Sequence, residues 1–408
     1  MKLTRLVFSL ILGVFFAAIS LGDSPSPSQK FLVFVGTYTD KTDSKGIYAY
    51  EFDTATGKLT PRGLAAETPN PSWVTIHPNG KFLYAANESG KQSTITAFSL
   101  NGVSGVFGGQ KVELRGPTKL TLLNQLPALG EDPCYLSFDK TGKFLFVANY
   151  TSGNVVVFPI LPDGKLGPAT ANVKDTGALG PNKERQEAPH AHWVQVSDDN
   201  RFAYVSDLGL DAVLIYRFDP SYANYGRPML GYSEGPSAEL PASTDRFILS
   251  PGTGPRHAAF LANGDFMYVL GELQSTVTVF KNRYEPGSSI RQISALPMGY
   301  SGRNDAAEIA IHPKGKWLFA SNRGHDSIAV FAIDPQKGTL TPARHYPTGG
   351  KEPRHFALDP TGQFLLAENQ NSNSIVTFRI NQATGGLTEV SAVDGVPSPV
   401  CLVFLPNP

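Results

Sequence analysis

Three polar residues around one predicted hairpin form the clearest chemical pattern in the chain. Arg256 and His257 open one apolar run, Glu272 closes the next, and Asn263-Gly264 between them is a strong signal for a tight turn. The start of one antiparallel strand lies beside the end of the next strand, so these three side chains should meet in space. A guanidinium, an imidazole and a carboxylate in contact could bind an anion and move a proton.

The turn, the apolar strand after it and a closing polar residue recur along the chain. The matching segments are HPNGKFLYAAN at 77–87, DKTGKFLFVAN at 139–149, SDDNRFAYVSD at 197–207, LANGDFMYVLG at 261–271, HPKGKWLFASN at 312–322 and DPTGQFLLAEN at 359–369. Long repeats made of short strands, without helical periodicity, are typical of a β-propeller. We therefore predict an all-β fold, a seven-bladed β-propeller that occupies residues 31–408 as one domain.

The seventh blade is predicted to be shared between the two ends of the chain. FLVFVG at 31–36 matches the second strand of the repeat without the strand before it, and SPVCLVFLP at 398–406 matches the first strand alone. Pairing of these N- and C-terminal strands would close the ring and remove two exposed sheet edges.

The hairpin argument, applied to every blade, brings polar residues to one end of the central axis. Those residues are Ser72, Trp73, Asn87, Glu88, Tyr135, Asn149, His190, His192, Asp207, Arg256, His257, Glu272, Glu308, Asn322, Arg323, Arg354, His355, Asn369 and Gln370. Arginines, histidines and carboxylates gather in the third to sixth blades, which suits an anionic small molecule as the ligand. We expect His190, Asp207, His257, Arg354, His355 and Gln370 to contribute to substrate binding.

Several of these residues also have a structural interpretation. His190 could order a loop, and Arg323 could pair with Asp326. Glu272 and Arg256 could form an isolated ion pair with a purely structural role. His77 and His312 stand in His-Pro-x-Gly turns, where we expect only structural roles.

No metal or other cofactor is predicted. His190-x-His192 could contribute two zinc ligands, but no motif supplies a third ligand.

Composition argues against a nucleic-acid partner, because 35 basic residues balance 35 acidic residues. Residues 1–22 are expected to form a secretory signal peptide, with a short apolar core, and residues 23–30 a disordered lead-in. A retained signal anchor is the alternative, although the core is shorter than a membrane span requires. We expect a secreted, extracellular monomer without membrane contact once the signal is removed.

Cys134 and Cys401 are assigned to the second and seventh blades, which are not neighbours, so two buried free thiols are expected. Asn87 and Asn149 begin N-glycosylation sequons, yet both occupy the same repeat position, where a turn role is equally compatible.

A set of short motifs resembles one known family. The motifs are VGTYT at 35–39, PHAH at 189–192, SDLGLD at 206–211, GPRH at 254–257, GEL at 271–273, SNRGHDSI at 321–328 and PRHF at 353–356. The chain resembles the seven-bladed propeller lactonases, which include propeller-type 6-phosphogluconolactonases and fungal carboxy-muconate lactonizing enzymes. By motif, the resemblance implies a catalytic set of His192, Arg256, Glu272 and Arg323.

The resemblance leads to two functional hypotheses. The first is metal-independent lactone chemistry on a carboxylated small molecule, either a lactonase or a muconate-type cycloisomerase. The second is a secreted propeller, antigen-like or binding a small molecule, that retains the scaffold without turnover. The predicted signal peptide distinguishes this chain from the cytoplasmic members of the family. A secreted enzyme would not meet the sugar phosphates of central metabolism.

Overall fold

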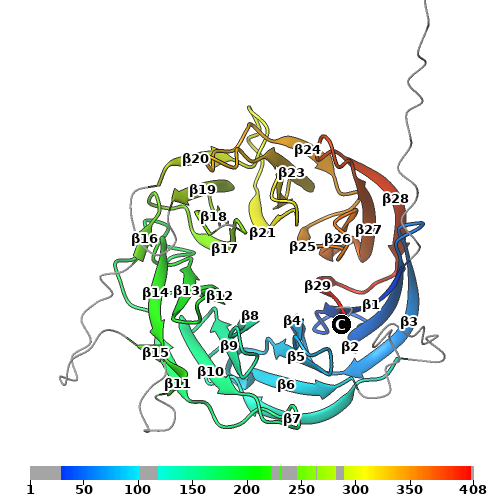
Figure 1. Cartoon of the computed structure of the whole chain (residues 1–408), viewed down its shortest axis with the longest axis vertical. Coiled ribbons are helices and arrows are strands. Elements are labelled where there is room, and N and C mark those ends of the chain that lie inside the picture. Colours follow the sequence, from blue (N-terminus) through cyan, green and yellow to red (C-terminus); the bar gives the residue numbers. More distant parts are fainter. Residues whose placement is uncertain are drawn as a thin grey trace, which may run out of the picture.

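The seven-bladed propeller is confirmed by the computed structural model, which describes residues 29–100, 118–221, 230–231, 246–262, 264–281 and 289–405. Seven antiparallel sheets surround a central axis, with one strand of each sheet innermost (Figure 1). Among the described residues, no helix is long and apolar enough to cross a membrane.

Blades 1 to 4 follow one another in chain order, each running from an inner to an outer strand. Blade 1 contains β4 (Pro71–Ile76), β5 (Phe82–Asn87), β6 (Thr94–Ser99) and β7 (Thr121–Pro127), with the 3-10 helix η1 (Gly90–Gln92) between β5 and β6. Blade 2 contains β8 (Pro133–Phe138), β9 (Phe144–Asn149), β10 (Asn154–Pro159) and β11 (Ala171–Lys174). Blade 3 contains β12 (Ala191–Val196), β13 (Phe202–Asp207), β14 (Ala212–Phe218), β15 (Leu230–Gly231) and β16 (Arg246–Ile248). Blade 4 contains β17 (Pro255–Phe260), β18 (Phe266–Gly271), β19 (Thr276–Lys281) and β20 (Arg291–Ser294).

Blades 5 to 7 complete the ring. Blade 5 contains β21 (Asp305–Ile311), β22 (Trp317–Arg323), β23 (Ser327–Ala332) and β24 (Arg344–Pro347). Blade 6 contains β25 (Pro353–Leu358), β26 (Phe364–Asn369), β27 (Ser374–Ile380) and β28 (Leu387–Asp394), with the 3-10 helix η3 (Gln370–Ser372) after β26. Blade 7 contains β29 (Pro399–Phe404), β1 (Lys30–Thr37), β2 (Gly46–Asp53) and β3 (Lys58–Glu67).

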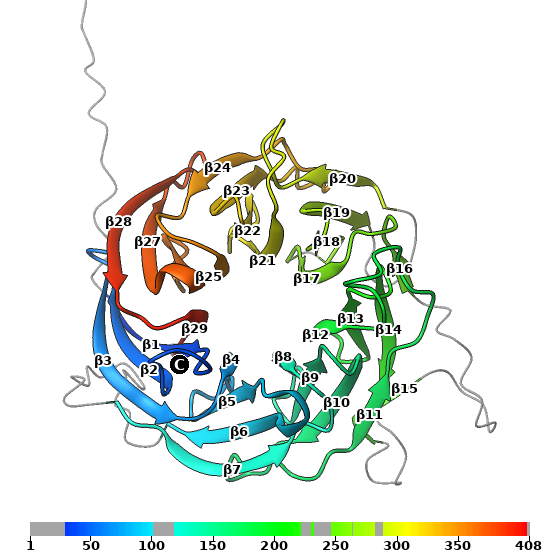
Figure 2. The same ribbon diagram turned by 180° about the vertical axis from the view of Figure 1, so that it is seen from behind.

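Blade 7 joins the two ends of the chain as the sequence predicted. β29 pairs antiparallel with β1, with Val33 opposite Phe404 and Gly36 opposite Cys401. The two strands lie side by side in both views (Figures 1 and 2). Lys30 is the first residue of β1, so the disordered lead-in predicted for residues 23–30 does not extend to this residue. The predicted signal peptide lies outside the described residues, as do most of the lead-in and residue Asn263 of the predicted turn.

The repeated turn before each second strand requires a left-handed residue. Gly142 has φ 69°, and its N–H donates to the carbonyl of Asp139 three residues earlier. In blade 3 the same position is held by Asn200 at φ 61°, with the same bond to Ser197. Glycine adopts this conformation without steric cost, and asparagine tolerates it better than most residues, which accounts for the Gly or Asn in every copy of the motif.

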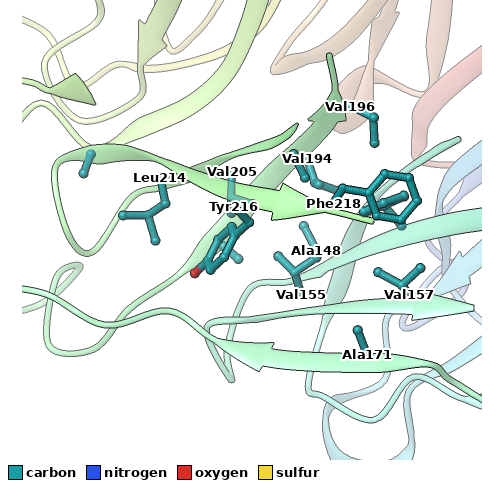
Figure 3. Packing of buried hydrophobic residues seen from close by; sticks show 14 of the residues in the cluster. Ala148, Val155, Val157, Ala171, Val194, Val196, Val205, Leu214, Tyr216 and Phe218 are labelled. Carbon is teal, nitrogen blue, oxygen red and sulfur yellow. The ribbon is translucent and has the colours of Figure 1, made fainter. Parts of the chain in front are cut away.

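Strand β10 contributes to two interfaces, because successive side chains point to opposite faces of a sheet. Val155 and Val157 of β10 pack in the cluster between blades 2 and 3, whereas Val156 packs in the cluster between blades 1 and 2. Figure 3 shows Val155 and Val157 facing Tyr216 and Phe218 of β14. These apolar interfaces fix the position of each inner strand around the axis.

The asparagine that ends the second strand of four blades is structural. The side-chain amides of Asn87, Asn149, Asn322 and Asn369 donate to carbonyls in the segment that enters their own blade. All four side chains are fully buried. Asn87 and Asn149 therefore cannot carry a glycan in the folded protein, which answers the question that their sequons raised.

Both cysteines are free and buried, as predicted. The thiol of Cys134 lies near the carbonyls of Ala148 and Ala191, and that of Cys401 near the carbonyl of Val74. Burial raises the pKa of each thiol, so the reactive thiolate is suppressed. We expect Ellman's reagent to label neither thiol rapidly in the native protein and both after unfolding in guanidinium. Rapid labelling of one thiol in the native state would contradict this packing.

Candidate active site

The inner strand of every blade begins with a β-bulge or register shift. The residues passed over by the strand pairing are Ser72, Cys134, His192, Arg256 with His257, Ala307 with Glu308, Arg354 and Val400. A bulge changes the direction of the side chain that it carries and is common beside functional sites. His192, Arg256 and Arg354 therefore hold equivalent positions in three different blades around one axis.

Glu272 is the centre of the candidate site. It follows β18, and its N–H donates to the carbonyl of Gly254 at 2.8 Å, which holds it beside the entrance to β17. Its Oε2 lies 3.1 Å from Nε of Arg256 and 3.2 Å from Nη2 of Arg323. Nε2 of His192 lies 4.0 Å from the same oxygen. The structure thus brings together all four residues that the resemblance implied.

A third cation, Arg185, also binds Glu272. Its Nη2 lies 2.6 Å from Oε1, and its Nη1 lies 3.6 Å from Oδ1 of Asp305. The side chain of Arg185 is 35% exposed, whereas that of Glu272 is 4% exposed. Arg185 therefore covers a buried carboxylate from the solvent side.

The cations decide the protonation of Glu272. Burial would raise the pKa of this carboxyl group, but the charges of Arg323 and Arg256 outweigh burial and hold the pKa well below its ordinary value. Burial and the neighbouring charge of Arg323 lower the pKa of Arg256 to about 10, so its guanidinium stays protonated at neutral pH. Glu272 is thus an anion at neutral pH, paired with guanidinium groups.

His192 is held as a neutral imidazole. Burial and the positive charge of Arg256 lower its pKa well below the ordinary value for histidine. Nδ1 lies 3.5 Å from the thiol of Cys134, and the ring meets Tyr150 edge to face at 5.3 Å between centroids. In the tautomer that donates Nδ1–H toward sulfur, the Nε2 lone pair lies on the side of Glu272. A neutral imidazole in this position is suited to accept a proton from water.

A second layer of side chains fills the axis next to this site. The ring of Trp73 contacts those of His257 and His355, although the three residues come from blades 1, 4 and 6. Nδ1 of His257 lies 3.0 Å from Oε2 of Glu308, and Nε2 of His355 lies 3.7 Å from the same oxygen. Residues from distant blades meet here, so the axis is occupied at this level.

The predicted binding residues His257 and His355 belong to this filled layer. Both are buried and pair with carboxylates, His257 with Glu308 and His355 with Glu368. Burial and Arg256 lower the pKa of His257. Burial would also lower the pKa of His355, but the Glu368 carboxylate outweighs it and raises that pKa. Their place in the fold makes them a packed floor beside the site.

Arg354 lies within electrostatic reach of the Glu272 cluster. The charge of Arg354 lowers the pKa of Arg256, and the charge of Glu272 raises the pKa of Arg354. Its guanidinium lies 5.5 Å from the centre of the Tyr38 ring. Within the described part of the chain, Arg354 forms no ion pair, so its donors remain available to a ligand.

Three predicted binding residues have other surroundings. The ring of His190 stacks on Tyr150 at 4.5 Å, and its Nδ1 contacts the Tyr150 carbonyl at 3.0 Å. Oδ1 of Asp207 accepts the N–H groups of His190 and Leu210, which orders the turn after β13. Gln370 begins η3 and contributes its N–H to the carbonyl of Glu352. The structure does not bring Asp207 or Gln370 into contact with the Glu272 cluster.

The structural alternatives are settled by geometry. Arg323 pairs with Glu272, while Asp326 accepts N–H bonds from Gly324 and Glu352. Arg323 and Arg185 also contact Glu272, so Arg256 and Glu272 do not form an isolated ion pair.

His77 and His312 have the structural roles that the sequence indicated. Each ring approaches the carbonyl of a turn glycine in the next blade through Nε2, Gly142 for His77 and Gly362 for His312.

Metal ligation has no geometric basis in the part of the chain that the structure describes, where no three His, Cys, Asp or Glu side chains could hold an ion together. His190 and His192 diverge, because His190 turns to Tyr150 and Glu187 while His192 turns to Glu272.

Two site residues were missed by the sequence argument. Arg185 lies in the connection between β11 and β12, and Tyr150 follows β9, with its hydroxyl 3.3 Å from Nη2 of Arg185. Arg185 belongs to no repeated position, since its loop occurs in one blade only. Tyr150 stood next to a repeated asparagine, and that position was a usable signal because its counterpart in blade 4 is Glu272.

Comparisons with known proteins agree with this architecture. Residues 32–404 match the family model described as lactonase, 7-bladed beta-propeller. A 6-phosphogluconolactonase of Bacillus subtilis is 33% identical over 378 residues, covering 92% of this chain and 99% of that protein. A 6-phosphogluconolactonase of Formosa agariphila is 33% identical over 331 residues, covering 79% and 85%.

A solved structure gives the same result at the level of the backbone. The periplasmic gluconolactonase of Pseudomonas aeruginosa superposes with a TM-score of 0.81 at 31% identity, covering 93% of this chain and 100% of that one. The chain belongs to the seven-bladed β-propeller lactonase family.

Proposed function

We propose that this protein hydrolyses the lactone of a polyhydroxylated acid, with the Glu272 cluster as its active site. The observation that carries the proposal is the position of the buried His192 imidazole, with Nε2 4.0 Å from a carboxylate that also binds Arg256 and Arg323. Relatives named 6-phosphogluconolactonase and gluconolactonase support an aldonolactone as the substrate.

His192 is proposed as the general base. Its Nε2 takes a proton from water as the water oxygen attacks the lactone carbonyl carbon, and the C–O bond of the ring then breaks. The imidazolium so formed, beside Glu272, returns the proton to the departing ring oxygen. The same low pKa that keeps His192 neutral makes the imidazolium a strong proton donor.

Arg256 and Arg323 are proposed to stabilise the tetrahedral oxyanion. Each places one nitrogen against Glu272, at 3.1 and 3.2 Å, so the two guanidinium planes are fixed before substrate arrives. Fixed donors in a site shielded from water stabilise developing charge better than mobile solvent does.

Hydrolysis is favoured over the lactonizing direction. Cyclisation of a muconate would require Glu272 as the proton donor, yet the surrounding arginines hold its pKa well below the ordinary range. A carboxylate that stays ionised orients its cations and gives no proton.

We further propose that the protein acts outside the cytoplasm, as a monomer. The apolar segment at residues 6–19, preceded by Lys2 and Arg5, motivates export. The match to a periplasmic gluconolactonase is in keeping with it. Cell fractionation and sedimentation of the mature protein test the two parts separately.

A panel of substrates tests the reaction and its direction. Acid release from aldonolactones and absorbance change with muconates would be followed for the wild type and for His192→Asn. We expect lactone hydrolysis by the wild type only and no muconate turnover. Ligand-induced stabilisation without turnover would instead favour the non-catalytic binding propeller.

The pH profile of the wild type should lack a limb near pH 6.5. A base acts when it is deprotonated, so a lowered pKa of His192 moves the acid limb of kcat/KM to lower pH. We expect kcat/KM to stay constant between about pH 6 and 7.5 after subtraction of spontaneous hydrolysis. A midpoint between pH 6 and 7 would contradict a desolvated His192 as the base.

A further inference from the structure

We propose that Arg354, Tyr38 and Glu88 form a second binding subsite that recognises a carboxylate at the far end of the lactone. The subsite deepens the proposed function and rests on it. It assigns the preferred substrate class as a sugar lactone with a terminal carboxylate, such as an aldaric acid monolactone, in preference to a phosphorylated one.

Arg354 holds the same position in its blade as two residues of the Glu272 cluster. Arg354 occupies the bulge of β25, equivalent to the bulges that carry His192 in β12 and Arg256 in β17. The inner strands that carry these positions, β12, β17 and β25, surround the same axis in blades 3, 4 and 6 (Figure 1). A ligand whose carbonyl lies at Arg256 can therefore extend toward Arg354 without leaving the axis.

The guanidinium donors of Arg354 are available to bind a ligand. Its guanidinium lies against the ring of Tyr38, at 5.5 Å from the centroid, and the residue as a whole is half-buried. No described carboxylate lies within ion-pair distance of it, whereas Arg185, Arg256 and Arg323 all engage Glu272. A half-buried guanidinium with open donors binds a carboxylate through two parallel hydrogen bonds.

Glu88 supplies the selectivity. The hydroxyl of Tyr38 donates to Oε2 of Glu88 at 2.8 Å, which fixes this carboxylate next to the ring that Arg354 covers. The charges of both Glu88 and Glu272 act on Arg354. Glu272 is already paired with Arg185, Arg256 and Arg323, so Glu88 is the carboxylate that opposes additional negative charge beside Arg354. Arg354 next to Glu88 suits a group with a single negative charge better than a phosphate dianion, which Glu88 repels more strongly. The second oxygen of Glu88 can accept hydrogen bonds from sugar hydroxyls.

Two matched pairs of lactones test the subsite. The carboxylate effect is the ratio of kcat/KM for glucaro-1,4-lactone to that for glucono-1,4-lactone. The phosphate effect is the ratio for 6-phosphoglucono-1,5-lactone to that for glucono-1,5-lactone. We expect a carboxylate ratio of about ten or more in the wild type, from one charge-assisted contact, and a smaller phosphate ratio.

Three variants assign the effect to residues. Arg354→Ala should lower the carboxylate ratio about tenfold, because it removes the charge-assisted contact, while any loss shared with the neutral lactone cancels in the ratio. Glu88→Gln should raise the phosphate ratio, because it removes one repelling charge. Arg379→Ala is the matched control, since Arg379 also covers an aromatic ring, Phe364, but is exposed on the outer part of blade 6.

A wild-type phosphate ratio above the carboxylate ratio, unchanged in Glu88→Gln, would overturn the proposal. Equal losses of kcat/KM on charged and neutral lactones in Arg354→Ala would also overturn it. If the alanine variant does not fold, Arg354→Lys takes its place in the same comparison. If no lactone is hydrolysed, the proposed function fails and the subsite is judged by binding alone. In that case glucarate should raise the Tm of the wild type more than gluconate does, and equal shifts would reject the subsite.

Discussion

Replacing Arg256 with alanine is expected to lower kcat/KM for lactone hydrolysis by about 10²- to 10³-fold, the usual effect of losing one oxyanion donor. Arg256 is buried, points Nε at Glu272 and donates through Nη1 to the carbonyl of Ala307. Arg256→Lys retains the charge but loses the planar fork, so its activity should fall between those of the wild type and the alanine variant.

Arg303→Ala provides the control for this experiment. Arg303 also lies near the entrance to blade 5, but its side chain is 90% exposed and pairs only with Asp305 among the described residues. Its loss should leave kcat/KM unchanged. Thermal unfolding of both variants separates loss of catalysis from loss of fold, and full activity of Arg256→Ala would remove Arg256 from the mechanism.

Glu272→Gln is expected to destabilise the protein by about 3 kcal/mol or more, because it leaves buried cations without their shared counter-charge. The carboxylate binds Arg256 and Arg323 with all three side chains at least 89% buried, and it also binds the more exposed Arg185. Inorganic phosphate should raise the Tm of this variant more than that of the wild type, since an added anion can replace the lost charge.

The pH dependence of this effect has a defined sign. The native pKa of Glu272 is depressed, so its contribution to stability is complete above about pH 4.3, where the unfolded carboxyl is ionised. The contribution is lost as pH falls toward the lower native pKa. The Tm difference between wild type and Glu272→Gln should therefore be constant near neutral pH and shrink in acid. Glu389→Gln, at an exposed position in blade 6, is the control. If Glu272→Gln lowered the Tm by no more than Glu389→Gln does, the account would be contradicted.

The fold was predictable because each repeat is marked by turn residues and apolar alternation, which involve residues close together in the chain. Turn residues such as Gly142 and Asn200 have to adopt positive φ, and the apolar alternation of Val155, Val156 and Val157 has to serve two interfaces. The shared blade 7 followed from two incomplete copies of the same pattern. Such signals depend on near neighbours in the chain, which a sequence displays directly.

The site was predictable only in part. Hairpin geometry places Glu272 beside the entrance to β17, as its hydrogen bond to Gly254 confirms. The register shifts at the inner strands are not encoded by any single residue type, so the sequence could not distinguish His192 in the site from His257 in the packed floor. Arg185 reaches Glu272 from a loop found in one blade, and no repeat could reveal it.

A double-mutant cycle on His192 and Arg256 tests the central claim most directly. kcat/KM for glucono-1,5-lactone would be measured for the wild type, His192→Asn, Arg256→Ala and the double variant at one pH. Both residues are proposed to act in one transition state around Glu272, so the double variant should lose little more than the worse single variant. Losses that multiply, as for independent sites, or a double variant as active as the wild type, would contradict the account.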